Sequence, residues 1–210
     1  MNAANKPRNA PALALFDIDG TLIRRAGHHH RMALVEAIRA ATGLATTTDS
    51  IPLYGMLDPV IITEMLRHAG APDALIHEAM PKIVRRAQAF YARECPNLER
   101  KMCPGVRRAL EKLERRGVVL GLVTGNLTRI GWKKMEQSGL KPYFRFGAFG
   151  EMAGSRAELV RMAEQEARRR KWIRDDAAVS LIGDAPNDIL AAQSAGVRSI
   201  AVSTGVIAAE

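Results

Sequence analysis

The chain has 210 residues, of which 47% are hydrophobic and 25% are charged. This is the composition of an ordinary globular protein that is long enough to bury a core, either as one domain or as a core with an insertion. No apolar run approaches membrane-spanning length and the first residues do not form a signal peptide, so we expect a cytoplasmic protein with no membrane partner. Residues 1–11 are mostly small or polar, and they include two prolines, which predicts a flexible tail.

The charge of the chain is strongly positive: the formal net charge is +9 and the isoelectric point is about 10.1. Such a chain attracts anions, and nucleic acid is one candidate partner. The arginine clusters, however, are spread over several predicted helices, and aromatic residues make up only 5% of the chain, so no surface for stacking bases is visible. A basic surface that draws in a small phosphorylated metabolite is favoured, and a non-catalytic nucleic-acid-binding protein remains an alternative.

The first predicted strand ends in two carboxylates, Asp17 and Asp19, which are followed by Gly20. Because side chains alternate along a strand, both carboxylates point to one side and Ile18 points to the other. Two neighbouring carboxylates repel each other unless a cation lies between them. Paired oxygen donors are ligands that Mg²⁺ prefers, so this stretch is a candidate catalytic and metal site.

The segment 24–100 carries helical patterns and no strand-like alternation. The predicted helices span residues 28–42, 58–69 and 72–94, and the third is expected to break or bend at Pro81. Three histidines, His28, His29 and His30, open the first helix. We interpret them as a solvated helix start, or as residues that face a substrate, because adjacent helix positions point in different directions and do not form a metal site.

From residue 101 onward, predicted strands and helices alternate. The strands are 118–123, 144–149, 179–184 and 199–202, and the helices are 104–116, 127–138, 156–172 and 186–195. This alternation predicts an α/β fold, a Rossmann-like parallel sheet with helices on both faces. The α/β core is therefore expected to comprise residues 12–23 and 101–210, with the helical segment inserted between its first two strands.

Polar side chains follow three of the predicted strands. The first pair of carboxylates is joined by Thr124 and Asn126 after one strand and by Asp184 after another, with Asp188 four residues further on. Ligands of parallel sheets bind at this edge, so these side chains are expected to meet. Phosphoryl transfer requires such a set, because the protein must supply a nucleophile and neutralise the phosphate oxygens.

Each of these residues has a role in that chemistry. Asp17 is the candidate nucleophile, and Asp19 can protonate the leaving group and later activate water. The hydroxyl of Thr124 can bind a phosphate oxygen, and the amides of Gly125 and Asn126, placed at a predicted helix start, favour an anion.

The ordered set of motifs resembles motifs one, two and four of the haloacid dehalogenase superfamily, over nearly the whole chain after residue 12. The motifs are Asp17-Ile18-Asp19-Gly20-Thr21, Thr124-Gly125-Asn126 and Gly183-Asp184-Ala185-Pro186-Asn187-Asp188. The resemblance implies the roles above and a Mg²⁺ ion held by the first and last acidic motifs. The metal set is then Asp17, Asp184, the backbone carbonyl of Asp19, and Asp188, which holds a metal-bound water or orients a neighbour.

The third motif departs from the family pattern. Family members usually place a lysine after the third strand, whereas this region reads Gly150-Glu151-Met152-Ala153-Gly154-Ser155-Arg156. Arg156 is the candidate substitute, because a guanidinium keeps its charge and can bridge two oxygens. The alternative is that Arg156 lies on the surface and that catalysis is impaired.

By the same resemblance, the segment 24–100 is similar to a helical cap that closes over the site and selects the substrate. Within it, Gly55-Met56-Leu57-Asp58 resembles a substrate-facing loop of phosphoglycolate-phosphatase-like members, which tend to have threonine in place of Leu57. Gly55 and Asp58 are therefore candidate substrate-binding residues, and Asp58 as a simple helix cap is the alternative.

The expected function is a Mg²⁺-dependent phosphatase that hydrolyses a small phosphomonoester, of the phosphoglycolate or sugar phosphate type, through an aspartyl-phosphate intermediate. A phosphosugar mutase shares the same core and remains an alternative. Asp19 argues against a dehalogenase, because that reaction does not need a second aspartate as the acid for the leaving group. A phosphonate hydrolase would need an amine from the cap to form a Schiff base, and Lys82 is the only lysine between residues 59 and 100 that could supply it.

Overall fold

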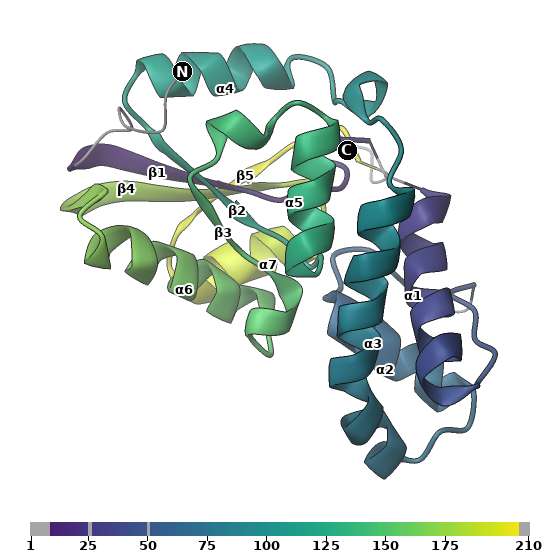
Figure 1. The fold of residues 1–210 in the computed structure, drawn as a ribbon. Coiled ribbons are helices and arrows are strands. Elements are labelled where there is room, and N and C mark those ends of the chain that lie inside the picture. The colour runs from purple at the N-terminus through teal and green to yellow at the C-terminus, as the bar shows by residue number, and fades with distance from the viewer. Residues whose placement is uncertain (1–8, 25–26, 50, 206–210) are drawn as a thin grey trace.

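The computed structural model describes residues 9–24, 27–49 and 51–205 and contains a parallel sheet in the order β3-β2-β1-β4-β5 (Figure 1). The five strands are β1 (Ala10–Phe16), β2 (Val119–Val123), β3 (Phe146–Ala148), β4 (Ile173–Gly183) and β5 (Arg198–Ala201). The α/β fold with a parallel sheet agrees with the sequence prediction. β1 begins at Ala10, inside the segment predicted as a tail, and residues 1–8 lie outside the described part of the chain.

The register of the sheet brings three strand ends together. β1 lies at the centre, and its last residue, Phe16, pairs with Leu122 of β2 on one side and with Ile182 of β4 on the other. The residues that follow these strands therefore emerge at one edge of the sheet. This edge carries all three motifs that the sequence placed at strand ends.

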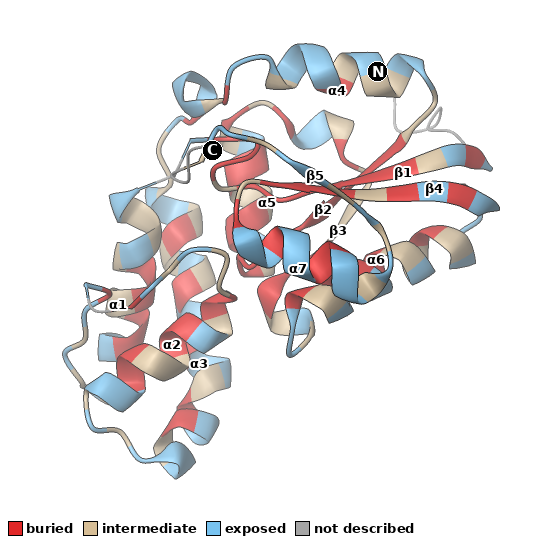
Figure 2. Cartoon of the chain, turned by 180° about the vertical axis from the view of Figure 1, so that it is seen from behind, coloured by how far each residue is buried: buried red, intermediate tan, exposed pale blue. Residues whose placement is uncertain are grey.

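The two faces of the sheet are covered by different helices because side chains alternate along β1. Leu13 and Leu15 pack with residues of α6 and α7, whereas Ala14 and Phe16 pack with residues of α4 and α5. These helices are α4 (Val106–Arg115), α5 (Thr128–Gln137), α6 (Arg156–Arg169) and α7 (Pro186–Ala195). Figure 2 shows buried residues along β1, β2 and β4 and on the inward sides of these helices, whereas β5 at the edge of the sheet is largely exposed.

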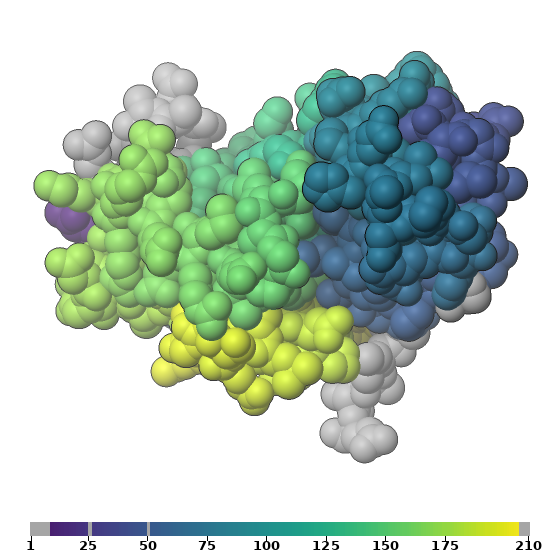
Figure 3. Space-filling model, turned by 90° about the horizontal axis from the view of Figure 1, so that it is seen from below, coloured from purple at the N-terminus to yellow at the C-terminus, as the bar shows by residue number. Residues whose placement is uncertain are grey.

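Three further helices form a helical unit between β1 and β2: α1 (His28–Thr42), α2 (Asp58–His68) and α3 (Asp73–Glu94). The unit has its own apolar cluster, which also includes Leu127 and Ile130 at the start of α5, so it packs directly against the core (Figure 3). The chain enters and leaves the unit at neighbouring points, since the amide of Arg24 donates to the carbonyl of Lys101 at 2.6 Å.

The structure differs from the sequence prediction in two elements. α3 continues through Pro81 as one helix, so the break that was one of the two expectations for this position is absent. β4 begins at Ile173, well before the predicted start at residue 179. The sequence prediction missed the first part of this strand because residues 174–176 are charged and interrupt the apolar pattern. Three short 3₁₀ helices lie at Glu99–Lys101, Lys141–Tyr143 and Gly150–Met152. Among the described residues, no helix is long and apolar enough to cross a membrane.

Leu15 supports the strand that carries the first motif, and its side chain is completely buried. We expect Leu15→Ala to lower the free energy of unfolding by about 2–5 kcal/mol, since it leaves a cavity under the sheet. Leu190→Ala is the control, because Leu190 is 59% exposed and its truncation should change stability by less than about 0.5 kcal/mol. Urea denaturation of both variants checks this, and equal losses would contradict the packing described here.

Candidate active site

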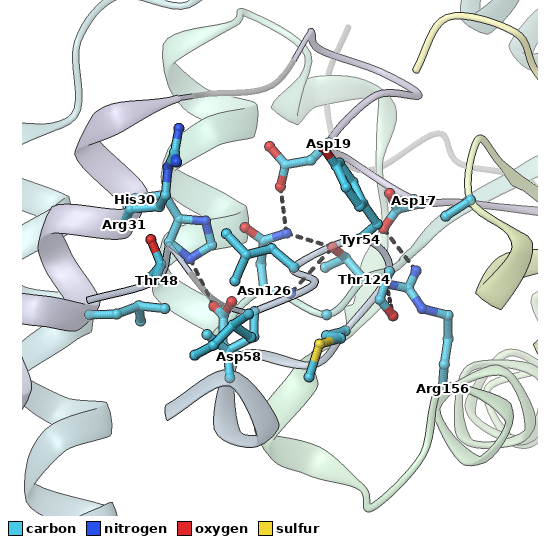
Figure 4. Close-up of a pocket in the computed structure, with 18 of the residues that line it drawn as sticks. Asp17, Asp19, His30, Arg31, Thr48, Tyr54, Asp58, Thr124, Asn126 and Arg156 are labelled. Carbon is cyan, nitrogen blue, oxygen red and sulfur yellow. Dashed lines mark hydrogen bonds and ion pairs between the residues drawn. The ribbon is translucent and has the colours of Figure 1, made fainter. Parts of the chain in front are cut away.

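A cavity of about 410 Å³ lies between the motif-bearing sheet edge and the helical unit (Figure 4). The core contributes the ends of β1, β2 and β4 and the start of α6. The helical unit contributes α1, the start of α2 and the loop between them. The cavity is lined by Asp17, Asp19, His30, Arg31, Tyr54, Gly55, Asp58, Thr124, Gly125, Asn126, Arg156 and Asp184, among others.

Asp17 directly follows the last residue of β1, is buried, and forms an ion pair with the guanidinium of Arg156. Nη1 of Arg156 donates to Oδ1 of Asp17 at 3.0 Å and to Oδ1 of Asp188 at 2.6 Å. Burial raises the pKa of Asp17 from an ordinary value of 3.8 to about 6; Arg156 opposes this rise, and the like charges of Asp188 and Asp19 add to it. The nucleophile predicted from sequence is therefore a buried carboxylate with one fixed cationic partner.

Arg156 occupies the place where the sequence predicted a substitute for the missing lysine. It is the first residue of α6, which begins with a capping box between Ser155 and Glu158, and its side chain is only 8% exposed. Burial lowers the pKa of its guanidinium, but the carboxylates of Asp17 and Asp188 outweigh burial and raise it. Its Nε is buried without a hydrogen-bond partner among the described residues.

Three carboxylates form an acidic cluster: single oxygens of Asp17, Asp184 and Asp188 lie within 4.8 Å of one another. Three acidic groups against one guanidinium leave an excess of negative charge, and oxygen donors of this kind suit Mg²⁺. Gly20 makes room for the cluster, because its φ is +93° and a Cβ there would collide with the Asp184 carboxylate.

The Asp188 carboxylate is engaged on both oxygens, by Arg156 on Oδ1 and by the amide of Ala185 on Oδ2 at 3.0 Å. Burial raises its pKa, against the opposing charge of Arg156. The predicted role of Asp188, holding a metal-bound water or orienting a neighbour, stays a prediction. Asp184 accepts a hydrogen bond from the hydroxyl of Thr21 at 3.0 Å.

The Asp19 carboxylate lies apart from the acidic cluster and is paired with a lysine that the sequence reasoning missed. Nζ of Lys134 donates to Oδ2 of Asp19 at 2.5 Å, and Nδ2 of Asn126 donates to the same oxygen at 2.8 Å. Burial by itself raises the pKa of Asp19, but the charge of Lys134 and the hydrogen bonds from Lys134 and Asn126 outweigh it and hold the pKa at about 2.

Lys134 lies on α5 with a side-chain exposure of 0%. A signal was present in the sequence, because Lys134 follows Ile130 by four residues and Leu127 by seven, on the apolar face of the helix. A charged residue on that face, one helix after the second motif, could have marked a buried partner for a carboxylate.

Thr124 and Asn126 meet as predicted, since Nδ2 of Asn126 contacts Oγ1 of Thr124 at 2.7 Å. The helix itself begins only at Thr128, later than expected. Its first amides are already satisfied: the amide of Leu127 donates to Asp58 at 2.8 Å and the amide of Thr128 to Glu151 at 2.9 Å. An anion at this edge would therefore meet the loop of Gly125 and Asn126, both of which line the cavity, rather than a free helix start.

Asp58 does not cap α2, whose N-cap is Leu57 and has no side-chain cap hydrogen bond. Its carboxylate accepts instead from the amide of Leu127 and contacts Nε2 of His30 at 3.0 Å. It thus lines the cavity, as one of the two sequence interpretations held. Gly55 also lines the cavity, and its carbonyl oxygen lies 3.4 Å from Nη2 of Arg156.

Of the three histidines, His30 reaches the cavity, where its Nδ1 lies 3.2 Å from Nζ of Lys134. His28 is exposed and His29 is half-buried. The histidine triplet therefore divides between a solvated helix start and a residue that faces the site, and no metal grouping among the described residues contains it.

Comparison with known proteins identifies several similar chains. The model of a family described as haloacid dehalogenase-like hydrolase matches residues 14–202. A phosphoglycolate phosphatase from Agrobacterium fabrum is 30% identical over 200 residues, covering 92% of this chain and 81% of that protein. A second phosphoglycolate phosphatase, from Pseudomonas fluorescens, is 25% identical and covers 93% and 70%.

Two solved structures share the fold. CbbY from Rhodobacter sphaeroides in complex with xylulose-(1,5)-bisphosphate has a TM-score of 0.65 at 23% identity, covering 91% of this chain and 85% of that chain. A β-phosphoglucomutase from Clostridium difficile has a TM-score of 0.64 at 16% identity, covering 90% and 83%.

The raised pKa of Asp17 predicts that this residue destabilises the fold at neutral pH. A carboxyl whose pKa rises from 3.8 to about 6 on folding stabilises the folded state below about pH 4, and this contribution is lost as the pH rises through about 6. Asp17→Asn removes the ionisable group, so we expect its melting temperature to exceed that of the wild type by several degrees at pH 7.5, because about 1 kcal/mol corresponds to 2–4 °C in a chain of this size.

The difference should shrink as the pH falls and vanish below about pH 3, where Asp17 is protonated in both states. Thermal unfolding of both proteins from about pH 3 to pH 8, in the presence of a chelator, provides the measurement. A variant that melts below the wild type at pH 7.5 would contradict this prediction.

Proposed function

The chain belongs to the haloacid dehalogenase-like hydrolase family, and we propose that it is a Mg²⁺-dependent phosphatase acting on a small phosphomonoester through an aspartyl-phosphate intermediate. Its membership and the phosphatases among its relatives support the predicted enzyme class, a hydrolase of phosphoric monoesters. The observation that carries the mechanism is the division of charge: Asp17 lies with Arg156 in the acidic cluster, and Asp19 is held separately by Lys134.

The first half-reaction uses both aspartates of the first motif. An oxygen of Asp17 forms a bond to phosphorus while the bond between phosphorus and the alcohol oxygen breaks. Asp19, which must first take up a proton from solvent because its pKa is held at about 2, donates that proton to the alcohol oxygen. The phosphate oxygens are bound by the hydroxyl of Thr124, the guanidinium of Arg156, and the loop amides of Gly125 and Asn126.

In the second half-reaction, the oxygen of a water molecule bonds to phosphorus and the bond to Asp17 breaks. Asp19 takes a proton from the water, so the products are the alcohol and inorganic phosphate and both aspartates are restored. One residue thus serves as acid and then as base.

The acidic cluster is where the proposed Mg²⁺ would bind, held by Asp17, Asp184 and the backbone carbonyl of Asp19. Asp188 would hold a metal-bound water or orient its neighbour Arg156. When bound there, the ion supplies positive charge that offsets the repulsion between a carboxylate nucleophile and a phosphate dianion. The raised pKa of Asp17 supports a positive charge at this position. Asp17, with its pKa raised to about 6, must be ionised to attack, and positive charge in the cluster lowers that pKa.

The substrate class follows from the size and the walls of the cavity. A space of about 410 Å³ suits a small metabolite, either of the phosphoglycolate type or a sugar phosphate. On this proposal the segment 24–100 is the cap, the core comprises residues 12–23 and 101–210, and the cap residues Gly55 and Asp58 select the substrate. The enzyme is expected to work in the cytoplasm. Nucleic acid is not its expected partner, because the aromatic residues that could stack on bases make up only 5% of the chain.

A phosphosugar mutase is the second candidate, favoured by the likeness to a β-phosphoglucomutase fold. Such an enzyme would return the phosphoryl group to a second sugar hydroxyl instead of to water. It would convert one phosphosugar into another without net release of phosphate.

The proposal predicts Mg²⁺-dependent release of phosphate from at least one member of a panel containing 2-phosphoglycolate and sugar phosphates. Chelation of Mg²⁺ and Asp17→Asn should each abolish release, because one removes the charge that offsets repulsion and the other removes the nucleophile. The matched control is Asp175→Asn, an exposed aspartate at which no loss is expected. Release that survives Asp17→Asn would refute the aspartyl-phosphate mechanism, and isomerisation without phosphate release would favour the mutase.

Arg156 offers a separate test, because it stands where relatives usually have lysine. We expect Arg156→Met to lower kcat by about 100-fold or more, since it removes a charge aimed at the transferring group, and Arg156→Lys to lose only about tenfold. Arg169→Met is the control, because that side chain is 66% exposed. Steady-state kinetics on the best substrate decide the matter, and an unchanged kcat in Arg156→Met would show that the guanidinium is dispensable.

A further inference from the structure

Among the described residues, Lys134 is a strongly buried cation near the site that the proposed mechanism does not use. Its ammonium has three N–H donors, and the structure places three acceptors around it: Oδ2 of Asp19 at 2.5 Å, Oδ1 of Asn126 at 2.5 Å and Nδ1 of His30 at 3.2 Å. The ring of Tyr91 lies 5.9 Å from the same Nζ. A buried ammonium with every donor engaged has a fixed position.

Lys134 and its neighbours fix one oxygen of Asp19 and leave the other available. Lys134 and Asn126 both donate to Oδ2 of Asp19, whereas no hydrogen bond to Oδ1 is found among the described residues. The Asp19 side chain is 26% exposed and lines the cavity, as Figure 4 shows for its position above Asn126. Oδ1 is therefore the oxygen that can exchange a proton with a bound substrate.

The third donor of Lys134 ties this arrangement to the helical unit. Because the ammonium donates to Nδ1 of His30, the ring proton resides on Nε2, which donates to Oδ2 of Asp58 at 3.0 Å. The Asp58 oxygen also accepts the amide of Leu127, in the core. A chain of contacts thus runs from Asp19 through Lys134 and His30 to the start of α2.

We propose that Lys134 is a positioning residue for Asp19: it fixes the carboxylate so that its free oxygen meets the leaving-group oxygen of the substrate. This inference rests on the proposed phosphatase function and assigns a role to a residue that the family motifs do not contain. Lys134 has two opposing effects on proton transfer by Asp19. Its charge makes a proton on the Asp19 carboxylate less stable, whereas its hydrogen bond to Oδ2 holds the carboxylate so that Oδ1 faces the leaving-group oxygen. Placement dominates, because a misplacement of about 1 Å costs about 100-fold in rate.

Leaving groups distinguish positioning from general support of the fold. The alcohol released from 2-phosphoglycolate is a poor leaving group that needs a proton, whereas the phenolate released from 4-nitrophenyl phosphate leaves without one. The parameter kcat/KM contains the steps up to release of the alcohol or phenolate. The ratio of the two kcat/KM values therefore measures what Asp19 contributes, and it does not depend on the fraction of a preparation that is folded.

The experiment measures this ratio for the wild type, Lys134→Met, Lys134→Gln and Lys133→Met, with Mg²⁺ present. If 2-phosphoglycolate is not turned over, the best alkyl phosphate of the panel replaces it. We expect Lys134→Met to lower kcat/KM by about 100-fold for the alkyl phosphate and by less than about fivefold for 4-nitrophenyl phosphate. Lys134→Gln keeps an amide donor, so its ratio should lie between those of Lys134→Met and the wild type, and it provides the measurement if Lys134→Met does not fold.

Lys133→Met is the matched control, since Lys133 pairs only with Glu136 on the same helix, among the described residues, and its ratio should equal that of the wild type. An unchanged ratio in both Lys134 variants would overturn the inference and leave Lys134 a structural residue. A raised ratio would also overturn it, because the charge of Lys134 would then outweigh its placement of Asp19. A wild type that releases phosphate from neither substrate would refute the proposed function, and the inference would fall with it.

Discussion

The site depends on one electrostatic constraint: carboxylates gathered at one sheet edge must be compensated if they are to be buried. Asp17 and Asp188 are nearly inaccessible to solvent, and removing such groups from water costs several kcal/mol each unless a partner offsets the loss. Two buried cations supply partners: Arg156 forms an ion pair with Asp17, and Lys134 forms one with Asp19. The proposed divalent ion would supply the remaining positive charge.

The two cations come from opposite faces of the sheet, and this separates two neighbouring aspartates into different environments. Arg156 reaches Asp17 from α6, on the face packed by Leu15, while Lys134 reaches Asp19 from α5, on the other face. Burial raises the pKa of Asp17 to about 6 although Arg156 opposes the rise, whereas at Asp19 the charge of Lys134 outweighs burial and helps to hold the pKa at about 2. Two residues of one strand end can thus take unlike roles, although the sequence presents them as a symmetric pair.

Residues whose position is set by the sheet could be predicted from the sequence. The apolar runs before Asp17, Thr124 and Asp184 identify buried strands, and parallel pairing then forces their ends to one edge. Arg156 was also found, because its place after the third strand left few candidates. The chemical roles of these residues remain predictions.

Contacts set by helix packing could not be derived in the same way. The apolar face of α5 predicts that Lys134 is buried, but its pairing with Asp19 depends on how α5 packs against the strand ends, which the local pattern does not fix. The partners of Asp58 could not be predicted from the sequence for the same reason. An aspartate at a helix start usually caps its own helix, and only the packing of the helical unit against the core shows that Asp58 accepts a hydrogen bond from the amide of Leu127 instead.

The helical unit is therefore part of the site rather than a neighbour of it. The loop before α2 approaches the second motif so closely that a Cβ on Gly125 would collide with the carbonyl of Met56, and the amide of Asp58 donates to the carbonyl of Gly125 at 2.8 Å. The same loop that would bind phosphate is thus fixed by the segment that would select the substrate. A change in how the helical unit sits would alter phosphate binding and, through His30 and Lys134, the placement of Asp19. Substrate selection and catalysis are therefore expected to share residues in this protein.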